Sequence, residues 1–203
     1  SVAPNGRKIR VKARHYVLAG GGINSPALLL RSDAPDPHSR LGKRTFLHLV
    51  NFSAGQFDEV INPFYGAPQS IYSDHFQWQD GTTGKMSYKL EAPPLHPGLA
   101  STLFGGYGTQ NALDMGQLPH THAMLALLRD GFHPDSQGGS VDLRGDGTPV
   151  LDYQVSPYAW DGLRRAFHSM AEIQFAAGAK SVKPLHHDAR YVKTLAEARS
   201  LID

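Results

Sequence analysis

Residues 17–30 read Val17-Leu18-Ala19-Gly20-Gly21-Gly22-Ile23-Asn24-Ser25-Pro26-Ala27-Leu28-Leu29-Leu30, and they predict a strand, a glycine turn and a helix start. The predicted strand, residues 11–18, runs directly into the three glycines. Glycine allows a sharp backbone turn and a close approach by another molecule. Ser25 is a suitable N-cap and Pro26 suits the first helical position, so we expect a helix from there to about Arg31.

This turn has two interpretations. A helix start offers free N–H groups and a partial positive charge, which favour a phosphate or a developing anion. The alternative is an ordinary connection between a strand and a helix that binds nothing. The turn alone leaves both open.

Composition limits the class of protein. The chain has 203 residues, enough for one domain or one domain with a piece of another. With 40% hydrophobic and 19% charged residues it suits a folded soluble protein, and both cytoplasm and periplasm are open as compartments. A net charge of +2 gives no reason to expect a nucleic-acid partner. The absence of cysteine excludes disulfides and thiolate sites, and no apolar run is long enough to predict a membrane span.

The two ends indicate a segment of a longer protein. The chain has no initiator Met and begins just before a predicted strand, and it stops in a helical pattern at Leu201-Ile202-Asp203. The oligomeric state is left open by the sequence.

The rest of the chain predicts an antiparallel sheet backed by one long helix. Ser156 and Pro157 cap that helix, which we expect to end at Gly178. The other expected elements are a strand containing His48 over 46–57, a hairpin of 71–78 with 86–92, a helix over 98–113 distorted at its glycines, a strand over 120–129, a hairpin of 138–143 with 150–155, a strand over 181–184 and a helix over 194–202. The predicted fold class is therefore α+β, preceded by the strand–glycine turn–helix piece of an α/β domain.

Local chemistry alone does not identify a function. His120 and His122 are two residues apart on a predicted strand, which puts both on one face as a possible metal pair. No third ligand is evident, so a polar sheet face is the favoured interpretation and no metal site is predicted. The sequence contains no P-loop, no G-x-S-x-G elbow and no G-x-G-x-x-G fingerprint.

Three segments together resemble the glucose–methanol–choline (GMC) family of flavin-dependent oxidoreductases. Residues 21–32, with small residues, Ser-Pro, leucines and Ser, are similar to the second signature of that family, although Asp33-Ala34-Pro35 departs from its continuation. Residues 41–48 match a Gly and a His of the family, with Leu49 where Pro is usual. Residues 134–143 and 147–153, followed by Asp161, resemble a hairpin and the helix after it in the substrate domain.

The resemblance implies a domain organisation and a division of labour. Residues 1–50 would be a fragment of the FAD-binding domain, 51–190 the substrate-binding domain, and 191–203 the start of the return to the FAD-binding domain. The family binds FAD through an N-terminal G-x-G-x-x-G unit and takes its catalytic histidine from a C-terminal segment. We therefore expect no catalytic residue in this chain, and an isolated fragment without activity.

The resemblance also implies the role of particular residues. The full enzyme would oxidise a small-molecule alcohol or sugar by hydride transfer to FAD. The residues expected near the cofactor are Gly20, Gly21, Asn24, Ser25 and His48. The residues expected in the substrate pocket, on an exposed sheet face, are Met86, Tyr88, His122 and Met124.

Two other hypotheses remain. One is a stand-alone carbohydrate or small-molecule binding module without catalysis, built on the aromatic residues Phe64, Tyr65, Tyr72, Phe76 and Trp78. The other is a metal-dependent hydrolase built on His120 and His122.

Overall fold

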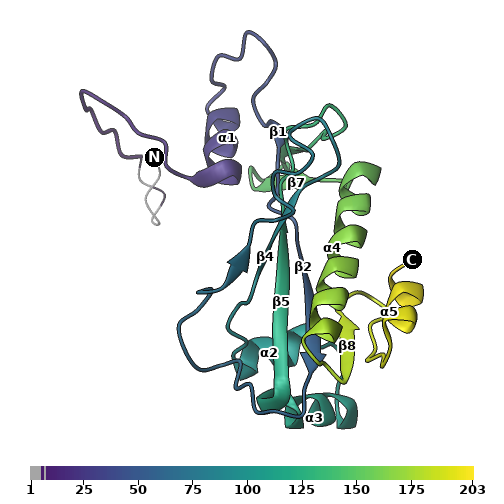
Figure 1. Ribbon diagram of the computed structural model, residues 1–203. Coiled ribbons are helices and arrows are strands. Elements are labelled where there is room, and N and C mark those ends of the chain that lie inside the picture. The colour runs from purple at the N-terminus through teal and green to yellow at the C-terminus, as the bar shows by residue number, and fades with distance from the viewer. Residues whose placement is uncertain (1–5, 7) are drawn as a thin grey trace. The chain divides into compact units, whose positions relative to one another are not determined.

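The computed structural model describes Gly6 and residues 8–203, and these residues form two compact units (Figure 1). The first unit combines the chain up to Thr45 with residues Gly139–Tyr153, and the second combines Phe46–Gly138 with Gln154–Asp203. The hairpin that includes residues 139–153 thus lies in the first unit, whereas the range 51–190 assigned it to the substrate-binding domain. Each unit is described by itself below.

The first unit is a helix beside a small sheet. Its three antiparallel strands, in the order β1-β6-β7, are β1 (Lys43–Thr45), β6 (Gly139–Leu143) and β7 (Pro149–Asp152). Helix α1 (Gly21–Arg31) contacts β6 and β7, and buries Ala27 completely. The Arg31 side chain donates a hydrogen bond to the carbonyl oxygen of Gly147 at 2.9 Å, which ties the end of α1 to the hairpin turn.

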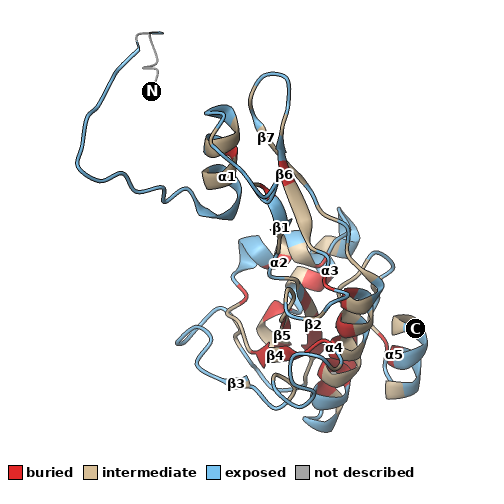
Figure 2. Ribbon diagram, turned by 90° about the horizontal axis from the view of Figure 1, so that it is seen from above, coloured by how far each residue is buried: buried red, intermediate tan, exposed pale blue. Residues whose placement is uncertain are grey.

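The strand predicted over residues 11–18 is wrong. In the described part of this segment the backbone is irregular and the side chains are exposed, with Val17 85% exposed (Figure 2). A strand needs a neighbour to pair its N–H and C=O groups, and the described residues bring none beside this segment. An alternation of basic and apolar residues extends this predicted strand back to Arg7, which lies outside the described residues.

The start of α1 also differs from the prediction. The helix begins at Gly21, so Ser25 is not its N-cap and Pro26 lies inside the helix. The Ser25 hydroxyl instead accepts a hydrogen bond from the backbone N–H of Gly20 at 3.0 Å, within the first turn. A serine side chain that bonds to nearby backbone in this way need not stand at the cap position. The helix ends at Arg31, as predicted.

The second unit contains a five-stranded antiparallel sheet in the order β3-β4-β5-β2-β8. Its strands are β2 (Val50–Gln56), β3 (Tyr72–Ser73), β4 (Tyr88–Glu91), β5 (Thr121–Leu128) and β8 (Ser181–Pro184). The long helix α4 (Pro157–Ala176) lies along one face of this sheet (Figure 1). The predicted combination of antiparallel strands and a backing helix is therefore present.

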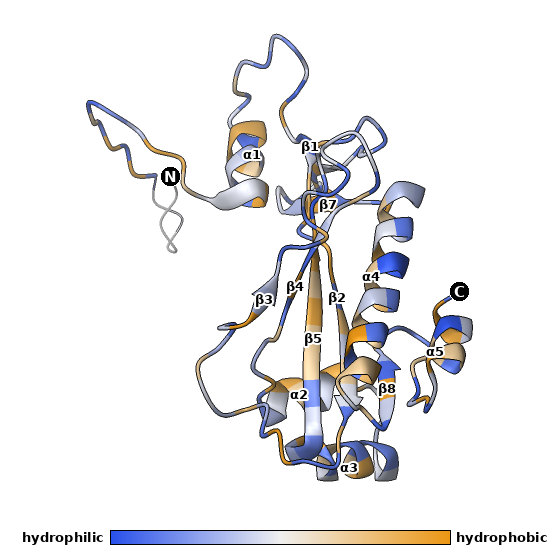
Figure 3. Cartoon of the chain, in the orientation of Figure 1, coloured by the Kyte–Doolittle hydropathy of each residue, from blue (hydrophilic) through white to orange (hydrophobic). Residues whose placement is uncertain are grey.

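Helix α4 approaches the sheet through small residues. Ala159, Gly162 and Ala166 are buried at the interface and let the helix lie close to the strands. Ser156 caps the helix as predicted, since its hydroxyl accepts a hydrogen bond from the N–H of Ala159 at 3.2 Å. The strands beneath are buried and strongly apolar, above all along most of β5 (Figures 2 and 3).

Two short helices cover one end of the opposite sheet face. Helices α2 (Pro97–Leu103) and α3 (Thr109–Gly116), with the 3₁₀ turn η1 (Leu118–His120), close a second core over Ala54 and Ala123. The single helix predicted over 98–113 is thus two helices. Gly105, Gly106 and Gly108 separate them with positive φ angles, a conformation that ends a right-handed helix.

A buried ion pair connects α3 to β8. The Lys183 ammonium group lies 3.0 Å from the Asp114 carboxylate and donates a hydrogen bond to the carbonyl oxygen of Phe104 at 2.8 Å. Gln110 donates to the other carboxylate oxygen of Asp114 at 2.9 Å. Both charged residues are buried, so each depends on the other for compensation.

The last element is α5 (Leu195–Ile202), which packs against α4 and β8. It begins with a capping box, in which the side chains of Thr194 and Glu197 each bond to the other's backbone N–H. In the part of the chain that the structure describes, none of the helices has the length and apolar character required to cross a bilayer.

The approach of α4 to the sheet predicts that Gly162→Ala destabilises the protein. A Cβ atom at Gly162 would lie 2.9 Å from the Cβ atom of Met86, closer than real contacts allow. The overpacking costs about 1–3 kcal/mol, against a gain of about 1 kcal/mol in helix propensity. Urea denaturation should show a net loss. Gly116→Ala in α3 is the control, because no heavy atom lies within 4 Å of its Cβ position; equal effects of both variants would contradict the prediction.

The buried pair predicts a second stability effect. Lys183→Met leaves the Asp114 carboxylate uncompensated, and we expect a loss of about 3–5 kcal/mol in the free energy of unfolding. The double variant Lys183→Met/Asp114→Leu removes both charges and should recover most of that loss. Denaturation curves of the three proteins test this, and a double variant no more stable than the single one would contradict it.

Candidate functional site

The four residues expected in the substrate pocket all lie on the sheet face that α4 covers. Met86, Tyr88 and Met124 are 1%, 3% and 8% exposed, and they pack with Met170 and the small residues of α4. The expectation that they line an open sheet face is therefore corrected. Their apolar surface is placed in the core because burial there removes it from water.

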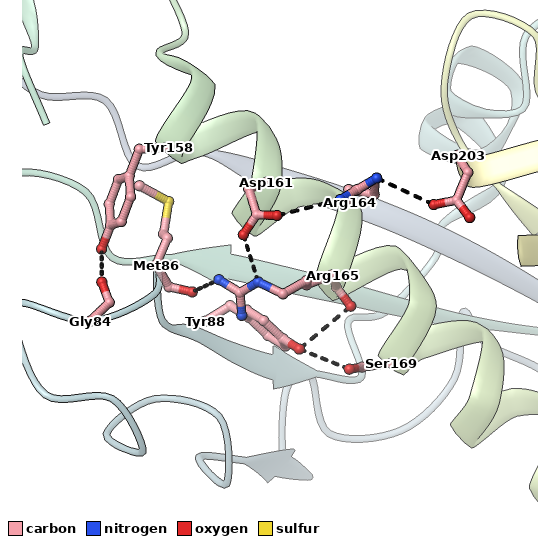
Figure 4. A network of polar contacts seen from close by, with 9 residues as sticks. All are labelled: Gly84, Met86, Tyr88, Tyr158, Asp161, Arg164, Arg165, Ser169 and Asp203. Atoms are coloured by element: carbon pink, nitrogen blue, oxygen red, sulfur yellow. Dashed lines mark hydrogen bonds and ion pairs between the residues drawn. The ribbon is translucent and has the colours of Figure 1, made fainter. Parts of the chain in front are cut away.

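Met86 and Tyr88 also belong to a polar clamp that fixes α4 to the strand (Figure 4). The Arg165 guanidinium donates hydrogen bonds to the carbonyl oxygen of Met86 at 2.7 Å and to the Asp161 carboxylate at 2.9 Å. The hydroxyl of Tyr88 lies 2.8 Å from that of Ser169. Burial raises the pKa of Tyr88, and the hydrogen bond from Arg165 lowers the pKa of Asp161. These contacts give the Met86 backbone carbonyl and the Tyr88 side chain a structural role.

His122 lies on the same covered face, near the C-terminal end of α4. Its ring packs edge-on against Phe57 with 6.2 Å between centroids, and burial lowers its pKa. His120 precedes β5, in η1, and its ring nitrogen lies 3.0 Å from the carbonyl oxygen of Glu59. The pair therefore does not share a strand face. Among the described residues no group of three His, Cys, Asp or Glu side chains could hold a metal ion.

The opposite sheet face carries a groove that we name the Lys89–Glu91 groove. Its volume is about 430 Å³, and its lining comes mainly from β4, from the end of β5 and the two residues after it, and from the segment before β2. Its apolar lining consists of Phe46, Leu47, Leu127 and Leu128. Its polar lining consists of His48, Gln77, Lys89, Glu91, Arg129 and Asp130.

Lys89 and Glu91 stand side by side on β4 and define the polar wall of the groove. The ammonium group of Lys89 lies 2.9 Å from the Glu91 carboxylate and 4.2 Å from the centre of the Tyr72 ring. The hydrogen bond to Glu91 raises the pKa of Lys89, so the ammonium form is favoured. The Glu91 side chain is only 10% exposed, and Lys89 is its charge partner.

Arg129 holds the rim of the groove. Its guanidinium lies 4.3 Å from the centre of the Trp78 ring, donates to the Ser87 hydroxyl at 3.2 Å and also donates to the carbonyl oxygen of Gly81. Backbone bonds fix the strand beneath it, where Leu128 donates to the carbonyl oxygen of Leu49 at 2.9 Å. Lys89 and Glu91 therefore stand on a regular strand, and the contacts of Arg129 hold the adjoining rim in place.

His48 lines this groove but does not lie in a strand. It is exposed in the segment before β2, which begins at Val50 and not at the predicted residue 46. The nearby residue Gly131 packs on the Phe46 ring, where a Cβ atom would lie 3.2 Å from ring carbons. The family resemblance places His48 near the cofactor, and within the second unit its neighbours are those of the groove.

The other residues expected near a cofactor lie in the first unit, at the start of α1. Gly20, Gly21 and Asn24 are exposed and Ser25 is half-buried. No side chain caps the helix, and Cβ atoms at Gly21 and Gly22 would meet no heavy atom within 4 Å. This turn therefore presents bare backbone to a ligand.

The aromatic residues of the carbohydrate-module hypothesis do not form a common surface. The Phe76 ring stacks on Tyr88 with 5.0 Å between centroids and belongs to the core. Tyr72 and Trp78 are exposed, and each has a cation near its ring centre, Lys89 at 4.2 Å and Arg129 at 4.3 Å respectively. Tyr65 is 87% exposed and contributes no ring contact in the part of the chain described.

Sequence reasoning missed Lys89, Glu91, Gln77, Arg129 and Asp130. The signal that could have found the first two is the alternation in residues 86–91, in which Met86, Tyr88 and Leu90 are apolar and the residues between them are polar. In such a pattern the apolar set faces the core, so the charged pair should face the other side.

Comparison with known proteins identifies relatives of this chain. Residues 1–50 match the family model described as GMC oxidoreductase. An uncharacterised GMC-type oxidoreductase of Mycobacterium tuberculosis is 31% identical over 179 residues, which cover 88% of this chain and 26% of the relative. The predicted family resemblance is confirmed, and the chain spans about a quarter of the length of this relative.

Two further relatives carry more specific names. A long-chain-alcohol oxidase of Arabidopsis thaliana is 25% identical over 189 residues, which cover 89% of this chain and 24% of the relative. A 6'''-hydroxyparomomycin C oxidase of Streptomyces lividus is 29% identical over 188 residues, which cover 88% of this chain and 33% of the relative.

The structural task of Tyr88 predicts the outcome of Tyr88→Phe. The variant loses the hydrogen bond to Ser169, and we expect the free energy of unfolding to fall by about 1 kcal/mol. Tyr72→Phe is the control, because the Tyr72 residue is 60% exposed and the aromatic ring under Lys89 is retained. Thermal or urea denaturation measures both. A Tyr88→Phe protein as stable as the control would contradict the assignment.

Proposed function

Since this chain is related to the GMC oxidoreductases over most of its length, we propose that it is a segment of a flavin-dependent oxidoreductase that oxidises the hydroxyl group of an alcohol or sugar by hydride transfer to FAD. The observation that carries this proposal is the alignment with a GMC-type oxidoreductase over 88% of the chain. The names of two relatives, a long-chain-alcohol oxidase and a 6'''-hydroxyparomomycin C oxidase, support oxidation of a hydroxylated small molecule.

The first unit is proposed to supply part of the cofactor site. The N–H of Gly20 is bonded to the Ser25 hydroxyl, but no side chain caps the N–H groups that follow it in α1, and the open space at Gly21 and Gly22 allows a pyrophosphate to approach them. Gly20, Gly21, Asn24 and Ser25 would therefore hold the anionic part of FAD. This donor set fits one wall of a dinucleotide site, while the G-x-G-x-x-G unit that the family uses is not in this sequence.

The second unit is proposed to supply the substrate wall. The Lys89–Glu91 groove has a volume within the usual range of small-molecule sites, ~300–1,000 Å³. Its strands orient the substrate, and its leucines and Phe46 exclude water from one side of it. When bound, the flavin supplies the hydride acceptor. The base that removes the hydroxyl proton is expected outside this chain, so the residues described here bind and orient.

The proposal is tested with the full-length protein that contains this segment. We expect it to purify with bound FAD, and anaerobic addition of an alcohol or sugar substrate should bleach the flavin absorbance. A full-length protein without flavin, which nevertheless binds a carbohydrate, would contradict the proposal and support the stand-alone binding module.

A glycine variant tests the cofactor wall. Gly22→Ala adds a methyl group that meets no protein atom within 4 Å, so the turn should fold unchanged, while a closely bound cofactor would be obstructed. We expect FAD affinity to fall about tenfold, equivalent to about 1.4 kcal/mol. Gly145→Ala, in the β6–β7 turn of the same unit, has equal space and should bind FAD as the wild type does. Flavin titration of the apoprotein measures both, and equal affinities would refute the assignment.

A further inference from the structure

The Lys89–Glu91 groove carries information about the class of substrate, and this inference rests on the proposed function. The two named relatives act on different compounds, a long-chain alcohol and 6'''-hydroxyparomomycin C, so their names leave the class of substrate open. The groove itself discriminates between these classes through its charges, their burial and their balance.

The charges of the groove balance. Lys89 and Arg129 contribute two positive charges, and Glu91 and Asp130 contribute two negative charges. A cationic or anionic substrate would meet one repulsive partner for each attractive one. A neutral substrate that both donates and accepts hydrogen bonds avoids this conflict, because each of its hydroxyl groups can bond to an ammonium group and to a carboxylate.

The burial of the carboxylate disfavours an alkyl chain. The Glu91 side chain is 10% exposed and the Lys89 side chain 29% exposed, and the two are in contact at 2.9 Å. An alkyl chain laid along this wall would remove the remaining water from both charged groups without replacing its hydrogen bonds, which is costly. A hydroxylated substrate replaces that water with its own donors and acceptors.

The apolar part of the groove suits a ring or a short carbon backbone. Leu127, half-buried on β5, pairs with Lys89 on β4, and Phe46 and Leu47 add apolar surface to the same groove. An apolar strip next to a polar strip matches a sugar or cyclitol, whose C–H faces are apolar and whose rim carries hydroxyl groups. The volume of about 430 Å³ lies at the small end of small-molecule sites.

We propose that the Lys89–Glu91 groove selects a neutral polyhydroxylated substrate, a sugar or polyol, over a long-chain alcohol, with Lys89 and Glu91 as the residues that determine this specificity. Both side chains are proposed to bind substrate hydroxyl groups and not to take part in hydride or proton transfer. Their contribution is therefore to KM more than to kcat.

The test begins with the wild-type full-length holoenzyme. Steady-state rates are measured with glycerol, sorbitol and D-glucose and compared with those for 1-hexanol and 1-dodecanol. We expect at least a tenfold higher kcat/KM for the best polyol or sugar than for either alkanol. A holoenzyme with reducible flavin that prefers an alkanol would overturn the inference and leave the proposed function standing. A protein without flavin would overturn both.

A paired variant tests the two residues. Lys89→Met/Glu91→Leu removes both charges with similar volume and leaves no unpaired buried group. We expect KM for the preferred polyol to rise at least tenfold, with kcat, flavin content and alkanol KM changed less than twofold. The control is Lys180→Met/Asp58→Leu, an exposed ion pair at 2.8 Å that does not line the groove. Unchanged selectivity in the Lys89→Met/Glu91→Leu variant would overturn the inference, and so would an equal shift in the control. If the groove variant does not fold, the ratio of kcat/KM for polyol to kcat/KM for alkanol in the wild-type enzyme decides.

Discussion

The close approach of α4 to the five-stranded sheet is the constraint on which the second unit depends. Gly162 leaves no room for even a methyl group, because the Met86 side chain packs directly against the helix backbone at this position. Polar contacts reinforce this packing at both ends. Asn51 donates to the carbonyl oxygen of Leu163 at 2.9 Å, and Ser53 donates to Gln174 at 2.6 Å. Because the helix fixes β2 and β4 together, it also determines which strand residues remain for the other face.

That constraint explains why the predicted site residues and the observed groove lie on opposite sides of one sheet. Side chains alternate along a strand, so a choice of face decides every residue at once. Strand position alone assigns Met86, Tyr88 and Met124 to an open face, but their apolar character makes them the set that α4 buries. Lys89 and Glu91, which alternate with the apolar residues of β4, are then left on the groove side.

The parts of the fold that the sequence predicts well are those with local causes. Ser156 and Pro157 define the start of α4 through a cap bond, and Gly178 ends it with a positive φ angle of 98°. The start of α5 at Thr194 has the same kind of cause. The failures have non-local causes. Residues 11–18 have strand composition, but a strand exists only beside another strand, and the described residues contain none in that position. Likewise, no local pattern reveals that Lys183 and Asp114 meet across 69 residues.

The candidate site combines both kinds of cause. The glycine turn has a local cause, because three consecutive glycines in the sequence already imply a backbone that no side chain covers. The groove has a non-local cause, because Phe46, Lys89 and Arg129 come together only when β4, β5 and the segment before β2 lie side by side. The paired carboxylate and ammonium groups lie on the uncovered part of a sheet face and need polar surroundings there. Removing a charged group from water or from its ion-pair partner has a high free-energy cost. Such a wall keeps its geometry while α4 holds the strands from behind, and the proposed selection of a polyhydroxylated substrate by two side chains requires this rigidity.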